Sequence, residues 1–180
     1  DYGAELPEGV LVLTAGVDTQ DDRMEYEIVG HGHFGETWGI ERGVIMGRPD
    51  DPAVWDSLDM MVFSRVLRFK DGVGLKVRKS FVDEGGHFTG AVRSFCQCRE
   101  SRSVFCIKGF PGPDKPYTEP PKKQKIIVNN RYLGTVWQYQ LGVDEGKQTI
   151  MDNLKVQSPG PKYCHFPLRD DYGAAYFNGL

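Results

Sequence analysis

The chain has 180 residues and is 39% hydrophobic, which is enough for one domain with a packed core and excludes an intrinsically disordered protein. Four cysteines, three of them within residues 96–106, are too few and too close together for a disulfide-stapled secreted domain, and no run reaches the roughly 20 apolar residues that span a membrane. The formal net charge of −3 excludes no class of partner, because acids and bases are unevenly distributed along the chain.

A continuous apolar run begins the predicted sheet. Residues 10–18 (VLVLTAGVD) are apolar and β-branched, as in a central strand that is buried on both faces, and the run ends in Asp18. Residues 23–34 alternate between polar and apolar side chains, and residues 37–46 form another strand candidate after a glycine turn. The pattern predicts three strands in an antiparallel meander.

A helix and a strand-helix-strand unit are predicted next. Residues 50–71 open with acidic caps and an early proline, and their apolar side chains follow the helical period. Residues 75–82 read as a second inner strand that again ends in an acid, Asp83. Residues 87–99 carry one apolar helical face, and residues 104–107 form a further strand. This order is typical of an α/β domain with a mixed sheet.

The last third of the chain mixes a loop, a hairpin and a helix. Residues 109–124 contain five prolines, which predicts an extended basic loop. Residues 126–140 contain the pair Asn129-Asn130, a plausible hairpin turn. Residues 144–154 are predicted to be helical and residues 163–166 to form a short strand, whereas the last dozen residues carry no clear pattern.

Carboxylates at strand ends are the main candidates for chemistry. Asp18 and Asp83 each end an apolar strand, so both project into one crevice if the two strands are neighbours. Carboxylates without His or Cys partners suit hard ions such as Mg²⁺ or Mn²⁺, and two such ions can promote phosphodiester hydrolysis. The alternative is that each Asp only caps the next element of the fold.

Basic side chains gather in the middle of the chain. Residues 1–60 carry 14 acids and 3 bases, residues 61–131 carry 6 acids and 15 bases, and residues 132–180 carry 5 acids and 4 bases. A positive central third suits a polyanion, because bound phosphates release their counterions, although a solvated surface is the alternative. The lysines predicted to contact such a polyanion are Lys108, Lys122, Lys123 and Lys125.

Other sites are weaker candidates. His31 and His33 share one face of a predicted strand, but no Cys or acid completes a zinc set, so we interpret them as surface residues. Cys96 and Cys98 lack the two-residue spacer of a zinc or redox motif and are expected to pack in the core. No glycine-rich loop ends in Lys-Ser or Lys-Thr, so the sequence shows no ATP site.

Several short motifs follow one another in order over roughly residues 10–180, nearly the whole chain. In chain order they are Gly16-Val17-Asp18-Thr19-Gln20, Asp22-Arg23-Met24-Glu25, Gly30-His31-Gly32, Phe81-Val82-Asp83-Glu84-Gly85-Gly86-His87-Phe88-Thr89, Phe105-Cys106-Ile107-Lys108-Gly109 and His165-Phe166-Pro167. Taken in this order, they resemble the nuclease domain of bacteriophage terminase large subunits of the lambda-like gpA family.

The resemblance implies an RNase H-like fold and a metal-dependent endonuclease that cuts concatemeric double-stranded DNA when genome packaging starts and ends. The metal-binding acids of the family fall on Asp18 and Asp83, which would hold Mg²⁺ or Mn²⁺, as two ions. The region after Lys108 matches the approach to the variable β-hairpin of the family. Implied partners are double-stranded DNA and, through the full-length protein, the terminase small subunit and the portal of the procapsid, in the host cytoplasm.

The chain departs from the family pattern at its end. The third acid of the family lies near the start of a C-terminal helix, which we expect beyond Leu180, and Asp171 is the internal candidate for this catalytic role. We expect residues 1–180 to form a single domain, with residues 1–9 as a linker from an ATPase domain that precedes it in the family. Two alternatives stay open: a non-catalytic DNA-gripping or partner-docking module, and a related resolvase or transposase.

Overall fold

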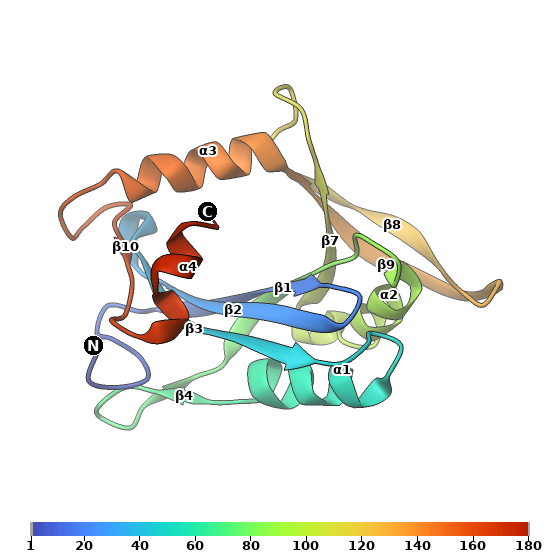
Figure 1. The fold of residues 1–180 in the computed structure, drawn as a ribbon, viewed down its shortest axis with the longest axis horizontal. Helices are drawn as coiled ribbons and strands as arrows, with labels where there is room; N and C mark the ends of the chain where they lie inside the picture. Colours follow the sequence, from blue (N-terminus) through green and yellow to red (C-terminus); the bar gives the residue numbers. More distant parts are fainter. Residues whose placement is uncertain (1, 180) are drawn as a thin grey trace.

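A computed structural model describes residues 2–179, so Asp1 of the expected linker and the terminal Leu180 lie outside the described residues. Within residues 2–179, eight strands form one sheet in the order β10-β3-β2-β1-β6-β7-β9-β8, and β4 and β5 form a separate small ribbon (Figure 1). The strands of the large sheet are β1 (Val12–Thr19), β2 (Arg23–His31), β3 (Thr37–Met46), β6 (Val77–Asp83), β7 (Val104–Phe110), β8 (Thr118–Val128), β9 (Arg131–Gly142) and β10 (Cys164–His165).

The meander and the inner strands confirm the predicted fold class. β1, β2 and β3 are consecutive and antiparallel, whereas β6 runs parallel to β1, β7 to β6 and β9 to β7. In β1 and β2 every second side chain is buried, so one face of the sheet carries the core and the other does not. The domain is α/β, with a mixed central sheet flanked by helices that is compatible with an RNase H-like fold.

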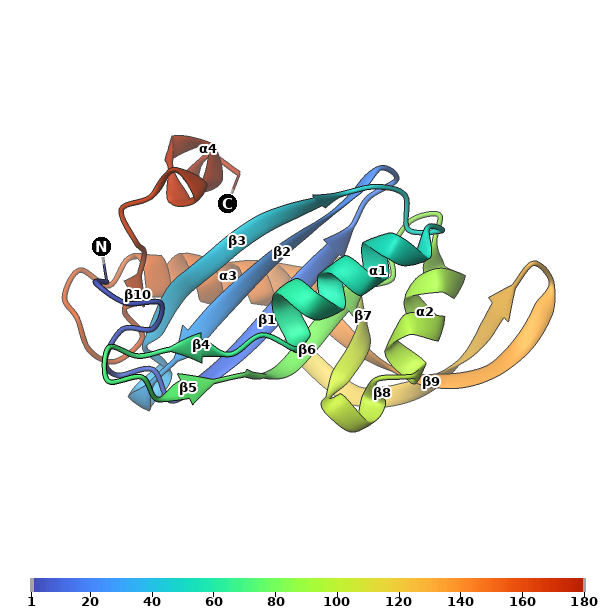
Figure 2. The same cartoon turned by 90° about the horizontal axis from the view of Figure 1, so that it is seen from below.

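Helices α1 (Pro52–Leu58) and α2 (Thr89–Gln97) cover the core face of the sheet. The Asp51 side chain accepts a hydrogen bond from the Ala53 amide at 2.9 Å and caps α1, as the acidic start predicted. Val92, Phe95 and Cys96 of α2 join the buried cluster. Figure 2 shows both helices in front of the sheet and α3 (Val143–Leu154) behind it, so α3 lies on the other side.

The first helix is shorter than predicted. α1 passes into a π-helical turn, η2 (Asp59–Phe63), and the chain then forms β4 (Leu67–Arg68), which pairs with β5 (Gly74–Leu75). Asp59 in this turn binds Arg99 at 2.7 Å and Arg102 at 2.8 Å. Burial alone would raise the pKa of Asp59, but hydrogen bonds from both arginines and from Ser64 lower it well below the usual range. These tertiary contacts override the helical periodicity of the sequence.

The prediction of an extended loop over residues 109–124 is wrong from Thr118 onward. β8 begins at Thr118 and forms a long hairpin with β9, which extends beyond the body of the sheet in both views (Figures 1 and 2). Asn129 and Asn130 have positive φ angles of 49° and 59° at its tip, which confirms the predicted turn. The prolines Pro120 and Pro121 are tolerated because β8 is the edge strand and its pairing shifts register between Glu119 and Lys122.

The C-terminal segment folds back on the meander. β10 pairs in parallel with β3, and the His165 ring stacks on Trp38 with ring centroids 4.7 Å apart. The following turns, η4 (Asp170–Tyr172) and α4 (Ala174–Phe177), bring the buried Tyr172 ring onto Gly39, where a Cβ atom would lie 2.8 Å from it. β10 confirms the short strand predicted over residues 163–166, whereas sequence patterns gave no assignment to η4 and α4, because these turns are held by side-chain contacts rather than by a regular period.

Candidate active site

Asp18 and Asp83 stand side by side at the carboxyl ends of two neighbouring parallel strands. The register pairs Val17 of β1 with Val82 of β6, so the next residues, Asp18 and Asp83, are laterally adjacent. Alternation along each strand points Val17 and Val82 into the core and both Asp side chains to the face that α1 and α2 leave free. The structure therefore brings together the two acids that the sequence placed at strand ends.

The carboxylates of this pair keep most of their oxygen lone pairs free. The Gln20 side chain donates a hydrogen bond to Asp18, and the Gly85 amide donates one to Asp83 Oδ1 at 2.9 Å. The structure shows no cation partner for either acid among residues 2–179. Two carboxylates with free oxygens have the donor chemistry that Mg²⁺ or Mn²⁺ prefers. No group of three or more His, Cys, Asp or Glu side chains in the described chain is arranged to hold a metal, so the pair is a partial ligand set.

A third acid, Glu25, lies beside Asp18 but is occupied by arginines. The antiparallel register places Glu25 of β2 directly opposite Asp18, on the same face of the sheet. Its oxygens bind Arg23 at 2.9 Å and Arg42 at 3.1 Å. The hydrogen bond from Arg23 is the main reason that the pKa of Glu25 is lowered. Sequence analysis did not single out this residue, although the alternation of β2 would have placed it on the face of Asp18.

Glu84, next in sequence to Asp83, belongs to the opposite face and to a buried network. It is 1% exposed and binds Arg93 of α2 through two contacts of 2.6 and 2.8 Å. Gln138 of β9 donates a further hydrogen bond to it, and Arg93 also donates to the Lys125 carbonyl of β8 at 2.7 Å. Both Glu84 oxygens are thus occupied, and the network ties the end of β6 to α2 and the β8–β9 hairpin. Its role is to hold the position of these elements.

A His–Asp contact lies at the rim of the acid pair. Asp21 belongs to the turn after β1, and His87 belongs to the loop after β6. The His87 Nδ1 atom lies 2.9 Å from Asp21 Oδ1, and the His87 side chain is 80% exposed. This contact joins the two loops that follow the strands of Asp18 and Asp83, so it fixes the rim of the site while leaving the imidazole open to solvent.

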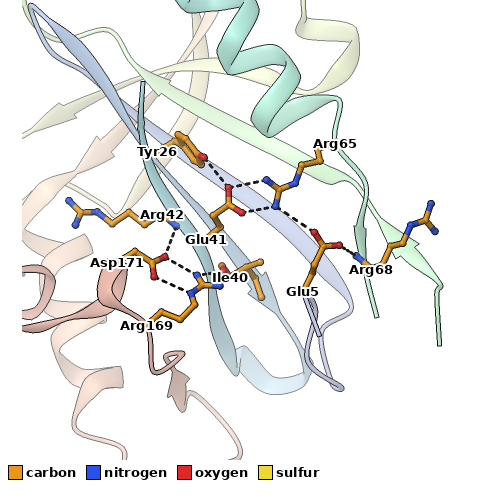
Figure 3. Close-up of polar contacts among 9 residues, drawn as sticks. All are labelled: Glu5, Tyr26, Ile40, Glu41, Arg42, Arg65, Arg68, Arg169 and Asp171. Atoms are coloured by element: carbon orange, nitrogen blue, oxygen red, sulfur yellow. Dashed lines mark hydrogen bonds and ion pairs between the residues drawn. The ribbon is translucent and has the colours of Figure 1, made fainter. Parts of the chain in front are cut away.

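Asp171 is not brought to the acid pair. Its carboxylate binds Arg169 at 2.8 and 3.0 Å and accepts a hydrogen bond from the Arg42 amide of β3 at 3.4 Å (Figure 3). β2 separates β3 from β1, so Asp171 lies across a strand from Asp18. Burial alone would raise the pKa of Asp171, but Arg169 lowers it below its usual value. Its role as a third metal ligand stays a prediction.

The expected DNA-binding lysines lie on regular strands. Lys122, Lys123 and Lys125 are exposed on β8, in the hairpin rather than in a loop, and Lys108 is exposed on β7. Lys122 is tethered to Glu119 at 2.8 Å, whereas the Lys123 ammonium lies over the Trp137 ring, 5.2 Å from its centroid. Trp137 and Tyr132 are 38% and 63% exposed, so cations and aromatic rings share the surface of the hairpin.

Comparisons with known proteins agree with this geometry. A family model described as "Terminase large subunit gpA, endonuclease domain" matches residues 1–180. The chain is similar to the terminase large subunit of Escherichia phage lambda, with 30% identity over 174 residues, 94% of this chain and 26% of that protein. It is 27% identical over 155 residues to that of Enterobacteria phage P21, covering 86% of this chain and 23% of that protein. The chain thus spans about a quarter of the length of these curated relatives.

Two further findings are negative. No solved structure matches the chain at a significant level. Among the described residues, no helix has the length and apolar character that crossing a membrane requires.

Proposed function

The chain belongs to the endonuclease-domain family of the terminase large subunit gpA, and we propose that it is a metal-dependent endonuclease that cuts concatemeric double-stranded DNA during phage genome packaging. The observation that carries this proposal is the lateral pairing of Asp18 and Asp83 on the free face of the sheet. Cuts at the start and at the end of packaging are part of the proposal, as is action in the host cytoplasm.

The pair would hold Mg²⁺ or Mn²⁺, as two ions, through its free carboxylate oxygens. When bound, such ions activate a water and stabilise the leaving oxygen of a phosphodiester. Asp18 and Asp83 would hold these ions together, because their strands fix the two carboxylates side by side at the carboxyl ends of β1 and β6. Gln20 and the Gly85 amide each hold one of the two acids in place. A further acid is needed for a full set, and we place it beyond Leu180, with Asp171 as the candidate inside the chain.

The substrate would be gripped through the β8–β9 hairpin. Lys123 and Lys125 also line a cleft of about 470 Å³ between β8 and the first turn of α2, together with Arg93. α2 covers the opposite face of the sheet from the acid pair, so a duplex bound by both would pass around the edge strand β8 to reach this cleft. Lysine contacts to phosphates give affinity that does not depend on sequence. Contacts with the terminase small subunit and the portal are proposed for the full-length protein.

The alternative is a non-catalytic DNA-gripping or partner-docking module with the same fold. The two functions differ in what they need from the acid pair. A gripping module tolerates loss of a carboxylate on the free face and even gains affinity for DNA, because a negative charge is removed. A nuclease does not tolerate it.

A plasmid-cleavage assay with Mn²⁺ tests the proposal. We expect the wild-type chain to nick or linearise supercoiled plasmid, and Asp18→Asn to remove this activity while DNA binding is kept. The matched control is Asp56→Asn, an exposed carboxylate on α1 at the other face, which should cleave like the wild type. Duplex binding by the wild type without any cleavage would favour the gripping or docking module, and full cleavage by Asp18→Asn would reject Asp18 as a metal ligand.

A further inference from the structure

A basic cleft lies at the amino ends of the inner strands β6 and β7, whereas the acid pair lies at the carboxyl ends of β1 and β6. It has a volume of about 500 Å³ and lies between the end of η2 and the turn before β7. Three cations and several serines line it, among them Lys76, Arg78, Arg102, Ser80, Ser101 and Ser103. We propose that this cleft binds a phosphate-bearing anion of the size of a nucleotide, at a site separate from the nuclease site.

The charge of the cleft is not balanced within the described chain. Lys76 and Arg78 are exposed, and the structure shows neither an ion pair nor a side-chain hydrogen bond for them among residues 2–179. Arg102 is held at the cleft by Asp59 at 2.8 Å and by the Ser64 hydroxyl at 3.1 Å. Asp59 also serves Arg99, so its single negative charge is already shared by two guanidinium groups. An anion is therefore the complementary ligand.

Ser80 supplies a second, independent sign of a ligand. It lines the cleft, its hydroxyl makes no side-chain hydrogen bond within the described residues, and this oxygen is not among the fully buried atoms without a partner, so it is open to the cleft. Its main-chain amide already donates a hydrogen bond to the Ser103 carbonyl at 2.9 Å. This bond fixes the backbone and leaves the hydroxyl available for a ligand. A hydroxyl that is open to the cleft and has no partner can donate a hydrogen bond to a phosphate oxygen. The neighbouring guanidinium groups match phosphate oxygens in the same way.

Size and position favour a free phosphate compound over the backbone of the DNA being cut. The volume falls within the range of small-molecule sites. Val77 and Asp83 are at opposite ends of β6, about 20 Å apart at the usual rise per residue. Ser80 points to the covered face and Asp83 to the free face. A straight duplex bound at the acid pair would have to pass around the edge of the sheet to reach this cleft. A free nucleotide or pyrophosphate could enter the cleft directly.

Calorimetric titration of the whole chain with ADP and with pyrophosphate, without divalent ions, tests this inference. We expect dissociation constants below about 1 mM for the wild type. Lys76→Ala combined with Arg78→Ala should weaken binding at least about tenfold, and Ser80→Ala by a smaller factor, because charged groups contribute more than a neutral hydroxyl. The matched control, Lys122→Ala with Lys123→Ala on the hairpin, should bind both compounds like the wild type.

A second arm uses a short DNA duplex and separates the two sources of phosphate. If the Lys76/Arg78 variant loses duplex binding while ADP and pyrophosphate never bind, the nucleotide-sized ligand is overturned and the cleft contacts the DNA backbone. Equal binding of ADP by the wild type and this variant would overturn the site itself. Both cations are exposed, so the variant should keep the wild-type unfolding midpoint, and Arg78→Gln alone decides the question if it does not. Plasmid cleavage should be unchanged in either variant, so failure here leaves the proposed nuclease untouched.

Discussion

Neighbouring carboxylates on the two faces of the sheet differ in how many hydrogen bonds their oxygens accept. On the covered face, Glu84 is buried and both of its oxygens are bound by Arg93 and Gln138. On the free face, Asp83 accepts one side-chain hydrogen bond, from a backbone amide, and Asp18 beside it accepts one from Gln20. An acid is available to bind a ligand where its oxygens are left open, and it stabilises the fold where they are filled. Hydrogen-bond occupancy, not residue type, separates the two roles.

The largest effect is expected at the free face. Asp83→Asn should lower plasmid cleavage with Mn²⁺ by about 100- to 1,000-fold, the range for losing one contact that stabilises a transition state. Its free energy of unfolding should stay within about 1 kcal/mol of the wild type, because Asp83 is half-exposed and carries one hydrogen bond. Chemical denaturation beside the cleavage assay measures both. A stability loss above about 3 kcal/mol would assign Asp83 a structural role.

The covered face should show the reverse result. Arg93→Ala leaves the Glu84 charge buried without its ion-pair partner, which should cost about 3–5 kcal/mol in the free energy of unfolding. The matched control is Arg48→Ala, whose pair with Asp50 is exposed, and it should unfold almost like the wild type. Denaturant titration followed by circular dichroism measures both variants. If Arg93→Ala is as stable as the control, the buried network does not hold the hairpin in place.

A smaller effect is expected on the hairpin. Replacing Lys122, Lys123 and Lys125 by Ala should weaken duplex binding about equally for all sequences and lower the salt slope by up to about 3, since each phosphate contact contributes nearly one unit. Fluorescence anisotropy over a series of salt concentrations gives the slope. The comparison variant replaces Arg68 and Lys70, on and beside β4, by Ala. If the slope falls in that variant instead, the DNA-binding face lies on the side of the β4–β5 ribbon.

The smallest effect is expected at Asp171. Because Arg169 occupies this carboxylate and β2 separates β3 from β1, Asp171→Asn should leave cleavage within a few-fold of the wild type and cost up to about 1 kcal/mol of stability. Cleavage should be better with Mn²⁺ than with Mg²⁺ and should rise when the residues after Leu180 in the parent protein are restored. Loss of Mg²⁺-dependent cleavage in Asp171→Asn would instead make Asp171 the third ligand.

Most of the fold could be predicted from local patterns. The apolar run before Asp18, the alternation of β2 and the turn at Asn129-Asn130 each fix an element by short-range chemistry. The helix after Pro52 was predicted too long, because the arginine contacts of Asp59 come from the turn after α2, far along the chain. The prolines of β8 favoured a loop, because a sequence does not show which strand will lie at a sheet edge.

The candidate site was only partly visible in the sequence. Strand ends pointed to Asp18 and Asp83, and the register of β1 and β6 places these two residues side by side. The sequence could also have predicted that Asp83 and Glu84 point to opposite faces of the sheet. Ser80, Val82 and Glu84 share one face by alternation, and all three are buried. The contacts of Asp171 with Arg169 and Arg42 could not be predicted, because they depend on how the C-terminal turn lies against β3.

The long edge strand β8 has a consequence for the solubility of the domain. A hairpin that extends past the sheet offers unpaired backbone groups to any second molecule, the usual start of edge-to-edge aggregation. Pro120 and Pro121 lack amide protons, the register shift beside them bends the strand, and the lysines that follow repel an identical edge. Removing these prolines and lysines should therefore make the domain associate through its hairpin more readily than the wild type does.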